Sequence, residues 1–379
     1  MMTEPNRRDV MQLAAAGAMA GVVAGEARAD GGGAVIDANM HWLPEDLFTD
    51  ERLLTAFVGA VPREYGIHAK VEAVPGKSLR QIVIEQPLGS EVLNYAENQY
   101  SATGQIADMD QAGIAQAILR LPCWQEWLPL DLCKRVNDGL AAHLSRHPGR
   151  FQALAVAPPW GTADAQKEIE RCIKELGFVG VQMAAHYGQL YLDDPAFKPH
   201  LKFLDQLGVP VVVHHTPLPV DYASIVKYPN LRRQYGRCLA QGTAVGRELF
   251  SGLFDEFPNL RLVHSMLGGG FFAFADMLVP PSTGGRDAVD RFADESAKLR
   301  GYLARNIFFD LSGAPQWGRA QLECAVKVFG ADHILYGASY PIRRDWFHDG
   351  VPLIRSLALS EAEKAAILGG NARRLFKLA

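Results

Sequence analysis

The sequence has little cysteine, no excess of positive charge and no phosphate-binding glycine loop. Its five cysteines contain no CxxC spacing, which argues against a disulfide framework and a cysteine zinc site, so we expect ordinary buried thiols. The formal net charge of −4 gives no basis for binding nucleic acid or an anionic membrane. No Gly-x-Gly-x-x-Gly follows the first apolar run, so a dinucleotide-binding fold would lack its phosphate loop.

The N-terminal segment is set apart from the rest of the chain. An arginine pair at 7–8 precedes an uncharged run over 10–25, and an A-x-A pattern occupies 27–29. This order resembles a twin-arginine export signal over 1–29, followed by a mature chain of 30–379 without a membrane span. The expected location is therefore the periplasm or the outside of the cell.

Eight short apolar runs follow one another along the mature chain, most of them separated by helical patterns. Near-continuously apolar runs are typical of parallel strands buried on both faces. The pattern predicts a single (β/α)8 TIM barrel with insertions after strand one (44–101) and strand six; a doubly wound open sheet is the alternative. A hairpin is expected around Pro75-Gly76 in the first insertion. The eight runs are VIDANMH, AQAILRLP, FQALAVAPP, FVGVQM, PVVVHH, LRLVHS, IFFDLSG and HILYGASYP.

Polar side chains collect at the carboxyl ends of these runs. Four of the eleven histidines fall there, and such ends meet at one mouth in a parallel barrel, where active sites lie. We therefore expect the mouth to be a working site. Its polar residues are Asn39, His41, Gln182, His214, His215, His264, Asp310, Ser312, Ser339 and Tyr340.

Several motifs, in order, resemble the amidohydrolase superfamily. They are IDANMHWLP, VGVQMAAH, VVVHHTP, FPNLRLVHSMLGGGF, HILYGASYP and ILGGNARRLF. The most similar branch contains aminocarboxymuconate-semialdehyde decarboxylase, aromatic carboxylate decarboxylases and related lactone hydrolases. The resemblance implies an enzyme that decarboxylates or hydrolyses a small aromatic or unsaturated carboxylate.

The resemblance also implies roles for residues of the mouth. The family binds a divalent metal through a His-x-His pair on strand one, a histidine on strand five and an aspartate on strand eight. His41 and His214 match metal ligands, and His264 matches the strand-six histidine that acts in acid/base catalysis. Asn39 stands in place of the first histidine and Ser339 in place of the aspartate. Because a neutral amide and a hydroxyl are poor ligands for zinc or manganese, we expect a degenerate centre with the metal weakly bound or absent.

Without the metal, the mouth retains chemically capable groups. His264 would act as general acid or base, and Asn39 and Ser339 would hydrogen-bond a carboxylate or oxyanion. Further candidates for substrate binding are His215, Gln182, Arg343 and Trp42, and the aromatic residues Trp124, Trp127, Trp160 and Tyr187 follow strands and are candidates for a pocket wall.

Two other hypotheses stay open. The first is a metal-independent lyase, hydratase or isomerase that works through His264. The second is a catalytically silent partner of an intact homologue. The long insertions are expected to provide an interface for a homo- or hetero-oligomer.

Overall fold

The computed structural model describes residues 33–280 and 296–378. The predicted export signal (1–29) lies outside these residues, and the insertion predicted after strand six falls partly on 281–295, also outside them.

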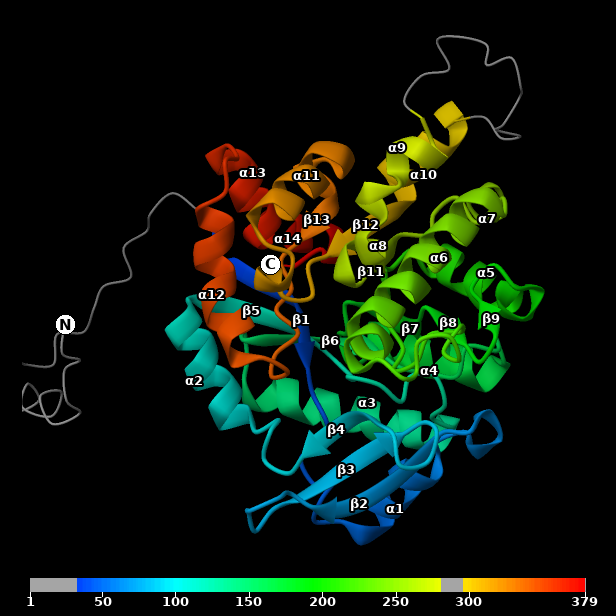
Figure 1. Ribbon diagram of the computed structural model, residues 1–379, viewed down its shortest axis with the longest axis vertical. Helices are drawn as coiled ribbons and strands as arrows, with labels where there is room; N and C mark the ends of the chain where they lie inside the picture. The colour runs from blue at the N-terminus through cyan, green and yellow to red at the C-terminus, as the bar shows by residue number, and fades with distance from the viewer. Residues whose placement is uncertain (1–32, 281–295, 379) are drawn as a thin grey trace, which may run out of the picture. The chain divides into compact units, whose positions relative to one another are not determined.

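Eight parallel strands lie side by side in the order β1-β5-β6-β7-β10-β11-β12-β13 (Figure 1). The first and last strands are joined by hydrogen bonds from Ala38 N to Tyr336 O (2.8 Å) and from His41 N to Tyr340 O (2.9 Å), so the sheet closes on itself. The predicted (β/α)8 barrel is confirmed. The strands are β1 (Val35–His41), β5 (Ile114–Arg120), β6 (Phe151–Ala155), β7 (Gly180–Ala184), β10 (Val211–His214), β11 (Leu262–His264), β12 (Ile307–Asp310) and β13 (Ile334–Leu335).

Helices alternate with the strands and surround the sheet (Figure 1). Local signals fix several of their ends: the Thr162 side chain accepts from Ala165 N at the start of α4, and Gly113 (φ 69°) ends α2 in the left-handed region. The main helices are α2 (Ala102–Ala112), α3 (Leu130–Arg146), α4 (Ala163–Lys174), α5 (Lys198–Leu207), α6 (Gly236–Phe250), α8 (Met266–Gly270), α9 (Ala275–Leu278), α10 (Ser296–Asn306), α11 (Arg319–Phe329), α12 (Arg344–Arg355), α13 (Glu361–Ala365) and α14 (Asn371–Phe376).

The first insertion folds into a small α/β layer. Helix α1 (Glu51–Gly59) precedes a three-stranded antiparallel sheet of β2 (His68–Ala73), β3 (Arg80–Glu85) and β4 (Glu91–Ala96). The hairpin expected around Pro75-Gly76 is confirmed, because β2 pairs with β3 from Ala73 opposite Arg80 onward.

An apolar cluster fills the barrel below the mouth. Its strand members are Ile36, Ala38, Ile118, Leu154, Val212, Val263 and Leu335, and Ala372, Phe376 and Leu378 from the C-terminal end join them. Side chains alternate along a strand, so a residue two positions beyond a cluster member also points inward, whereas its direct neighbour points outward. On the regular strands this alternation decides which strand-end residues face the mouth. In β1 a register shift between Asp37 and Met40 interrupts the alternation, so Asn39, the direct neighbour of Ala38, lies with Arg120 and Asp310.

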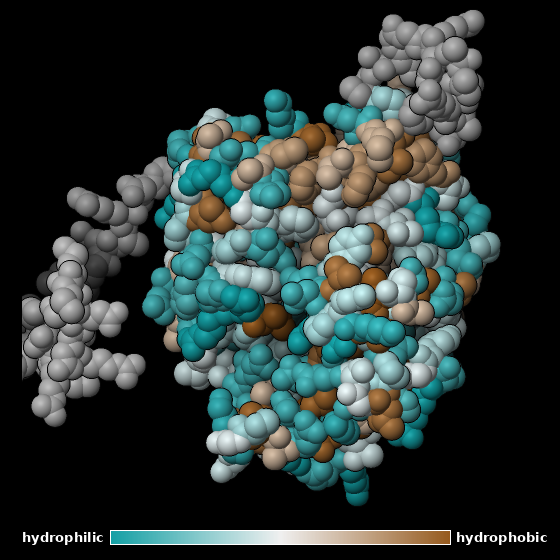
Figure 2. All heavy atoms as spheres, in the orientation of Figure 1, coloured by the Kyte–Doolittle hydropathy of each residue, from teal (hydrophilic) through white to brown (hydrophobic). Residues whose placement is uncertain are grey.

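The cysteines and the surface differ in part from expectation. Cys123, Cys133 and Cys172 are buried thiols, but Cys238 is half-buried and Cys324 is exposed, which corrects the prediction that all five are buried. Figure 2 shows polar and apolar side chains interspersed over one face. None of the helices within 33–280 and 296–378 combines the length and apolar character needed to cross a bilayer.

The turn after β11 provides a test of the fold. Gly269 has φ +67°, and a Cβ there would lie 1.8 Å from the carbonyl oxygen of Cys238. We expect Gly269→Ala to lower the free energy of unfolding by about 3 kcal/mol, measured by urea denaturation. Gly246→Ala in α6 is the control: its Cβ would meet nothing within 4 Å, so stability should be kept or rise by up to about 1 kcal/mol. Equal midpoints for the two variants would contradict this packing.

Candidate active site

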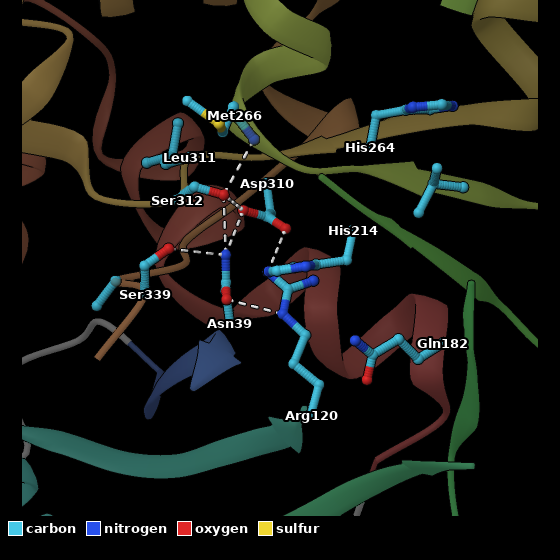
Figure 3. Close-up of polar contacts among 12 residues, drawn as sticks. Asn39, Arg120, Gln182, His214, His264, Met266, Asp310, Leu311, Ser312 and Ser339 are labelled. Atoms are coloured by element: carbon cyan, nitrogen blue, oxygen red, sulfur yellow. Dashed lines mark hydrogen bonds and ion pairs between the residues drawn. The ribbon is translucent and has the colours of Figure 1, made fainter. Parts of the chain in front are cut away.

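Polar side chains from several strands point into the barrel mouth (Figure 3). Arg120 stands two residues beyond Ile118, and His214 stands two residues beyond Val212, so both follow a member of the interior cluster. The inward-facing polar residues at these strand ends are Arg120, Gln182, His214 and Asp310.

A buried ion pair lies at the centre of this group. Arg120 Nη2 donates to Asp310 Oδ2 at 3.0 Å, and both side chains have no exposed surface. Arg120 Nε donates to Asn39 Oδ1 at 2.8 Å. Asn39 Nδ2 in turn lies 3.0 Å from Asp310 Oδ1, 2.8 Å from Ser312 Oγ and 3.1 Å from Ser339 Oγ. The amide of Asn39 is therefore fixed by a cation on one side and by acceptor oxygens on the other.

This cluster places Asn39 and Ser339 together at the mouth, as their strand positions indicate. Both polar atoms of the Asn39 amide bond within the cluster, and Ser339 Oγ accepts from Asn39 Nδ2; the roles of the two residues toward a substrate stay predictions. Arg120 was not among the predicted site residues. The signal was a charged residue at the end of an otherwise apolar run, two positions after Ile118.

Three histidines form a second group beside the cluster. His41 Nε2 lies 3.2 Å from His214 Nε2, and the rings of His214 and His215 are 4.1 Å apart between centroids. Burial, followed by the charge of Arg120, holds the pKa of His41 well below its usual range. Burial also lowers the pKa of His214 and His215, with His215 and Arg120 adding to the effect on His214. The three rings are therefore neutral at physiological pH.

His264 does not join these groups. Its neighbour Val263 belongs to the interior cluster, so the His264 ring points outward to α6. There Nδ1 lies 2.9 Å from Gln241 Oε1, and Nε2 lies 2.7 Å from Glu248 Oε2. Burial raises the pKa of Glu248. An acid/base role for His264 stays a prediction, and its position on the helix side of the sheet argues against that role.

The other predicted binding residues contact protein groups and do not line the cavity. The Gln182 amide bonds to both backbone groups of Leu121, accepting at 3.0 Å and donating at 2.8 Å. Trp42 is buried in the outer core, its ring 6.0 Å from that of His143. Arg343 is on the surface and pairs with Asp345. Each of these side chains is thus held by packing or by a bond to another protein group.

A cavity of about 950 Å³ opens next to the histidines. Its walls come from the loops after β5, β6, β7 and β10 and from the first insertion. Gln125 connects it to the mouth, because its side chain lines the cavity and its Nε2 lies 3.5 Å from His214 Nδ1. Of the aromatic residues considered from the sequence, Trp127, Trp160 and Tyr187 line this cavity, whereas Trp124 is buried in the core.

The side chains of the mouth do not fit the metal that the family resemblance implies. His41 and His214 offer ring nitrogens, but the other two positions hold an amide and a hydroxyl that bond within the cluster. Asp310, the nearby carboxylate, is paired with Arg120. Within residues 33–280 and 296–378, no three histidine, cysteine, aspartate or glutamate side chains gather to hold a metal ion.

A parallel barrel with a polar mouth and an adjoining cavity at the carboxyl ends of its strands is the architecture of a barrel enzyme. The chain belongs to the amidohydrolase family, whose sequence profile matches residues 36–378. The expected membership is thereby confirmed.

Known relatives of similar sequence and structure support membership of this family. The chain is 32% identical over 299 residues to gamma-resorcylate decarboxylase from Rhizobium sp., covering 71% of this chain and 85% of the relative. Among solved structures, 2,6-dihydroxybenzoate decarboxylase from Rhizobium superposes with a TM-score of 0.68 at 24% identity, covering 91% of this chain and 99% of that one. The 5-carboxyvanillate decarboxylase of Novosphingobium aromaticivorans, complexed with manganese, gives a TM-score of 0.69 at 22% identity, covering 91% and 96%. The expectation of an enzyme related to carboxy-lyases is confirmed.

The contacts of His264 generate a stability prediction. His264→Ala would leave Glu248 buried without its partner, so we expect the free energy of unfolding to fall by about 3–5 kcal/mol in urea denaturation. The His264→Leu, Glu248→Leu double variant removes both groups and should lose less than the sum of the two single losses. Unchanged stability in His264→Ala would show that the pair does not hold α6 against β11.

Proposed function

We propose that this protein decarboxylates a small aromatic carboxylate bound in the cavity, through a mouth altered from the family's metal centre. The observation that carries the proposal is the cavity itself, which has aromatic walls and a carboxyl group whose buried oxygens have no side-chain partner among the described residues. Its volume of about 950 Å³ suits a small molecule. The decarboxylase relatives at about a third sequence identity support this reaction over hydrolysis.

The walls of the cavity match a flat apolar ring. Trp160 stands 6.0 Å from Tyr187 between ring centroids, and aromatic faces and edges provide both apolar area and favourable ring–ring geometry. The aromatic side chains that line it are Tyr65, Trp127, Trp160, Tyr187 and Tyr222.

Glu126 is the chemically distinctive group of this cavity. Both carboxyl oxygens are shielded from solvent, and no other side chain among the described residues bonds to them. The backbone N–H groups of Glu126 itself and of Trp124 act on the carboxyl and lower its pKa by less than burial raises it. Burial raises the pKa of Glu126 to about 8, so at neutral pH the group is a carboxylic acid that holds a proton. A neutral acid beside a bound ring is suited to donate that proton.

Decarboxylation requires such a donor. The bond between the ring carbon and the carboxylate breaks, carbon dioxide leaves, and the electron pair of that bond remains on the ring carbon. The proton of Glu126 then forms the new carbon–hydrogen bond, and water returns a proton to the carboxylate. The other titratable side chains around Glu126 are Glu64, Tyr65, Cys123, His186, Tyr187 and Tyr222. Burial lowers the pKa of His186 to about 4, so that histidine stays neutral where Glu126 titrates.

Glu126→Gln tests the donor. We expect turnover of an aromatic carboxylate to fall by about 10²–10⁴-fold, because the amide has no acidic proton. Binding of 2,6-dihydroxybenzoate, measured by calorimetry, should change little. In the unsubstituted protein the rate should fall as pH rises through about 8, because the acid form of Glu126 is lost there; the variant should lack that limb.

The matched control is Glu175→Gln, an exposed glutamate at the end of α4. It should keep both the rate and the pH profile. Full activity in Glu126→Gln would remove the donor role. Absence of carbon dioxide release by the unsubstituted chain from a panel of hydroxybenzoates would favour the silent-partner hypothesis instead.

We also propose that residues 1–29 direct export by the twin-arginine route. The arginine pair, the uncharged run and the A-x-A pattern support this. Cell fractionation and N-terminal mass spectrometry should find a chain that begins at Asp30 outside the cytoplasm. The Arg7→Lys, Arg8→Lys double variant should remain uncleaved in the cytoplasm, whereas Arg28→Lys, which keeps the A-x-A pattern, should be exported. Export of the double variant would contradict the proposal.

A further inference from the structure

The guanidinium of Arg120 is held more firmly than a single ion pair requires. Nη2 donates to Asp310 and Nε donates to Asn39, so two edges of the group are fixed by residues of two other strands. Nη1 is also buried and has no partner among the described residues. A buried arginine costs free energy through desolvation, and a donor without a partner adds to that cost. Such an arrangement is typical of a site rather than of packing alone.

The partners of Arg120 are the second observation. Asn39 and Ser339 are the two positions where this chain departs from the metal ligands that the family resemblance implies. Both departures fall in the same cluster: Asn39 Oδ1 accepts from Arg120, and Asn39 Nδ2 lies 3.1 Å from Ser339 Oγ (Figure 3). Where the family resemblance implies a histidine ligand, this chain has Asn39, whose amide oxygen accepts a hydrogen bond from the Arg120 guanidinium.

The charges of the mouth also argue against a bound divalent metal. A divalent ion needs anionic or strongly donating ligands around it. Here the carboxylate at the mouth is Asp310, and its oxygens are taken by Arg120, Asn39 and Ser312. Arginine keeps its positive charge at every physiological pH. The cluster therefore already contains a permanent cation, which Asp310 pairs directly and which Asp37 also attracts.

We infer that Arg120 supplies, as a fixed guanidinium, the positive charge that a divalent metal would bring to this mouth, and that the site is built to work without the metal. His41 and His214 remain as a hydrogen-bonded pair rather than as ligands. Asp310 balances the guanidinium rather than a metal. Arg120 acts through Asn39 and Asp310 and is in this sense a positioning residue.

The first experiment uses the unsubstituted mature protein, purified without chelator from cells grown with added manganese and zinc. Inductively coupled plasma mass spectrometry should find less than about a tenth of an equivalent of either metal, since two imidazoles alone are a weak site. The midpoint of thermal unfolding should not change with Mn²⁺, Zn²⁺ or EDTA. Near-stoichiometric metal, or a midpoint that rises with metal, would overturn the inference.

The second experiment restores the implied ligands. The Asn39→His, Ser339→Asp double variant should still contain little metal, because Arg120 remains in place. Adding Arg120→Ala should raise the metal content to about one equivalent, since a His₃Asp-type ligand set is then unobstructed. About one equivalent of metal in the double variant would show that Arg120 does not prevent metal binding at the mouth.

The matched control adds Arg135→Ala, in place of Arg120→Ala, to the double variant. Arg135 is an exposed residue of α3 that pairs with Asp46. That variant should behave as the double variant does. If the variant without Arg120 does not fold, the unsubstituted protein and the double variant still decide the question. None of these readouts uses turnover, so failure of the proposed decarboxylation and failure of this inference are distinguishable.

Discussion

The buried pair between Arg120 and Asp310 constrains the rest of the mouth. Two opposite charges without solvent around them become more stable as hydrogen bonds satisfy more of their remaining donors and acceptors. Asn39 and Ser312 do this for Asp310, and Asn39 does it again for Arg120. The amide of Asn39 can have only one orientation here, because its oxygen must face the guanidinium and its nitrogen must face the carboxylate.

The residues of the barrel interior are arranged in layers along the barrel axis. The apolar cluster fills the amino-terminal part, the charged cluster and the histidines lie above it, and the aromatic cavity follows beyond Gln125. Beyond this charged layer, the loops that line the cavity contain Glu126.

Much of the fold could be predicted from the sequence, because buried parallel strands are short and almost wholly apolar. All eight strands, the hairpin in the insertion and α3 follow from such patterns. Helix α6 begins at Gly236, although Gly242 and Gly246 weaken its helical pattern, because packing holds it. The insertion's α1 and β4 were missed, although Asp50 caps α1 and Leu53, Leu54 and Phe57 form its buried face.

The site could be predicted only in part. His41 and His214 come together as the motifs indicate. The outward orientation of His264 followed from strand alternation beyond Val263, a signal that the motif comparison did not use. The pairing of Arg120 with Asp310 spans distant strands and is not visible in either segment. Finally, one wall of the cavity belongs to the insertion, and the other belongs to barrel loops. The shape of the cavity can therefore change through the insertion's wall while the eight barrel strands stay the same.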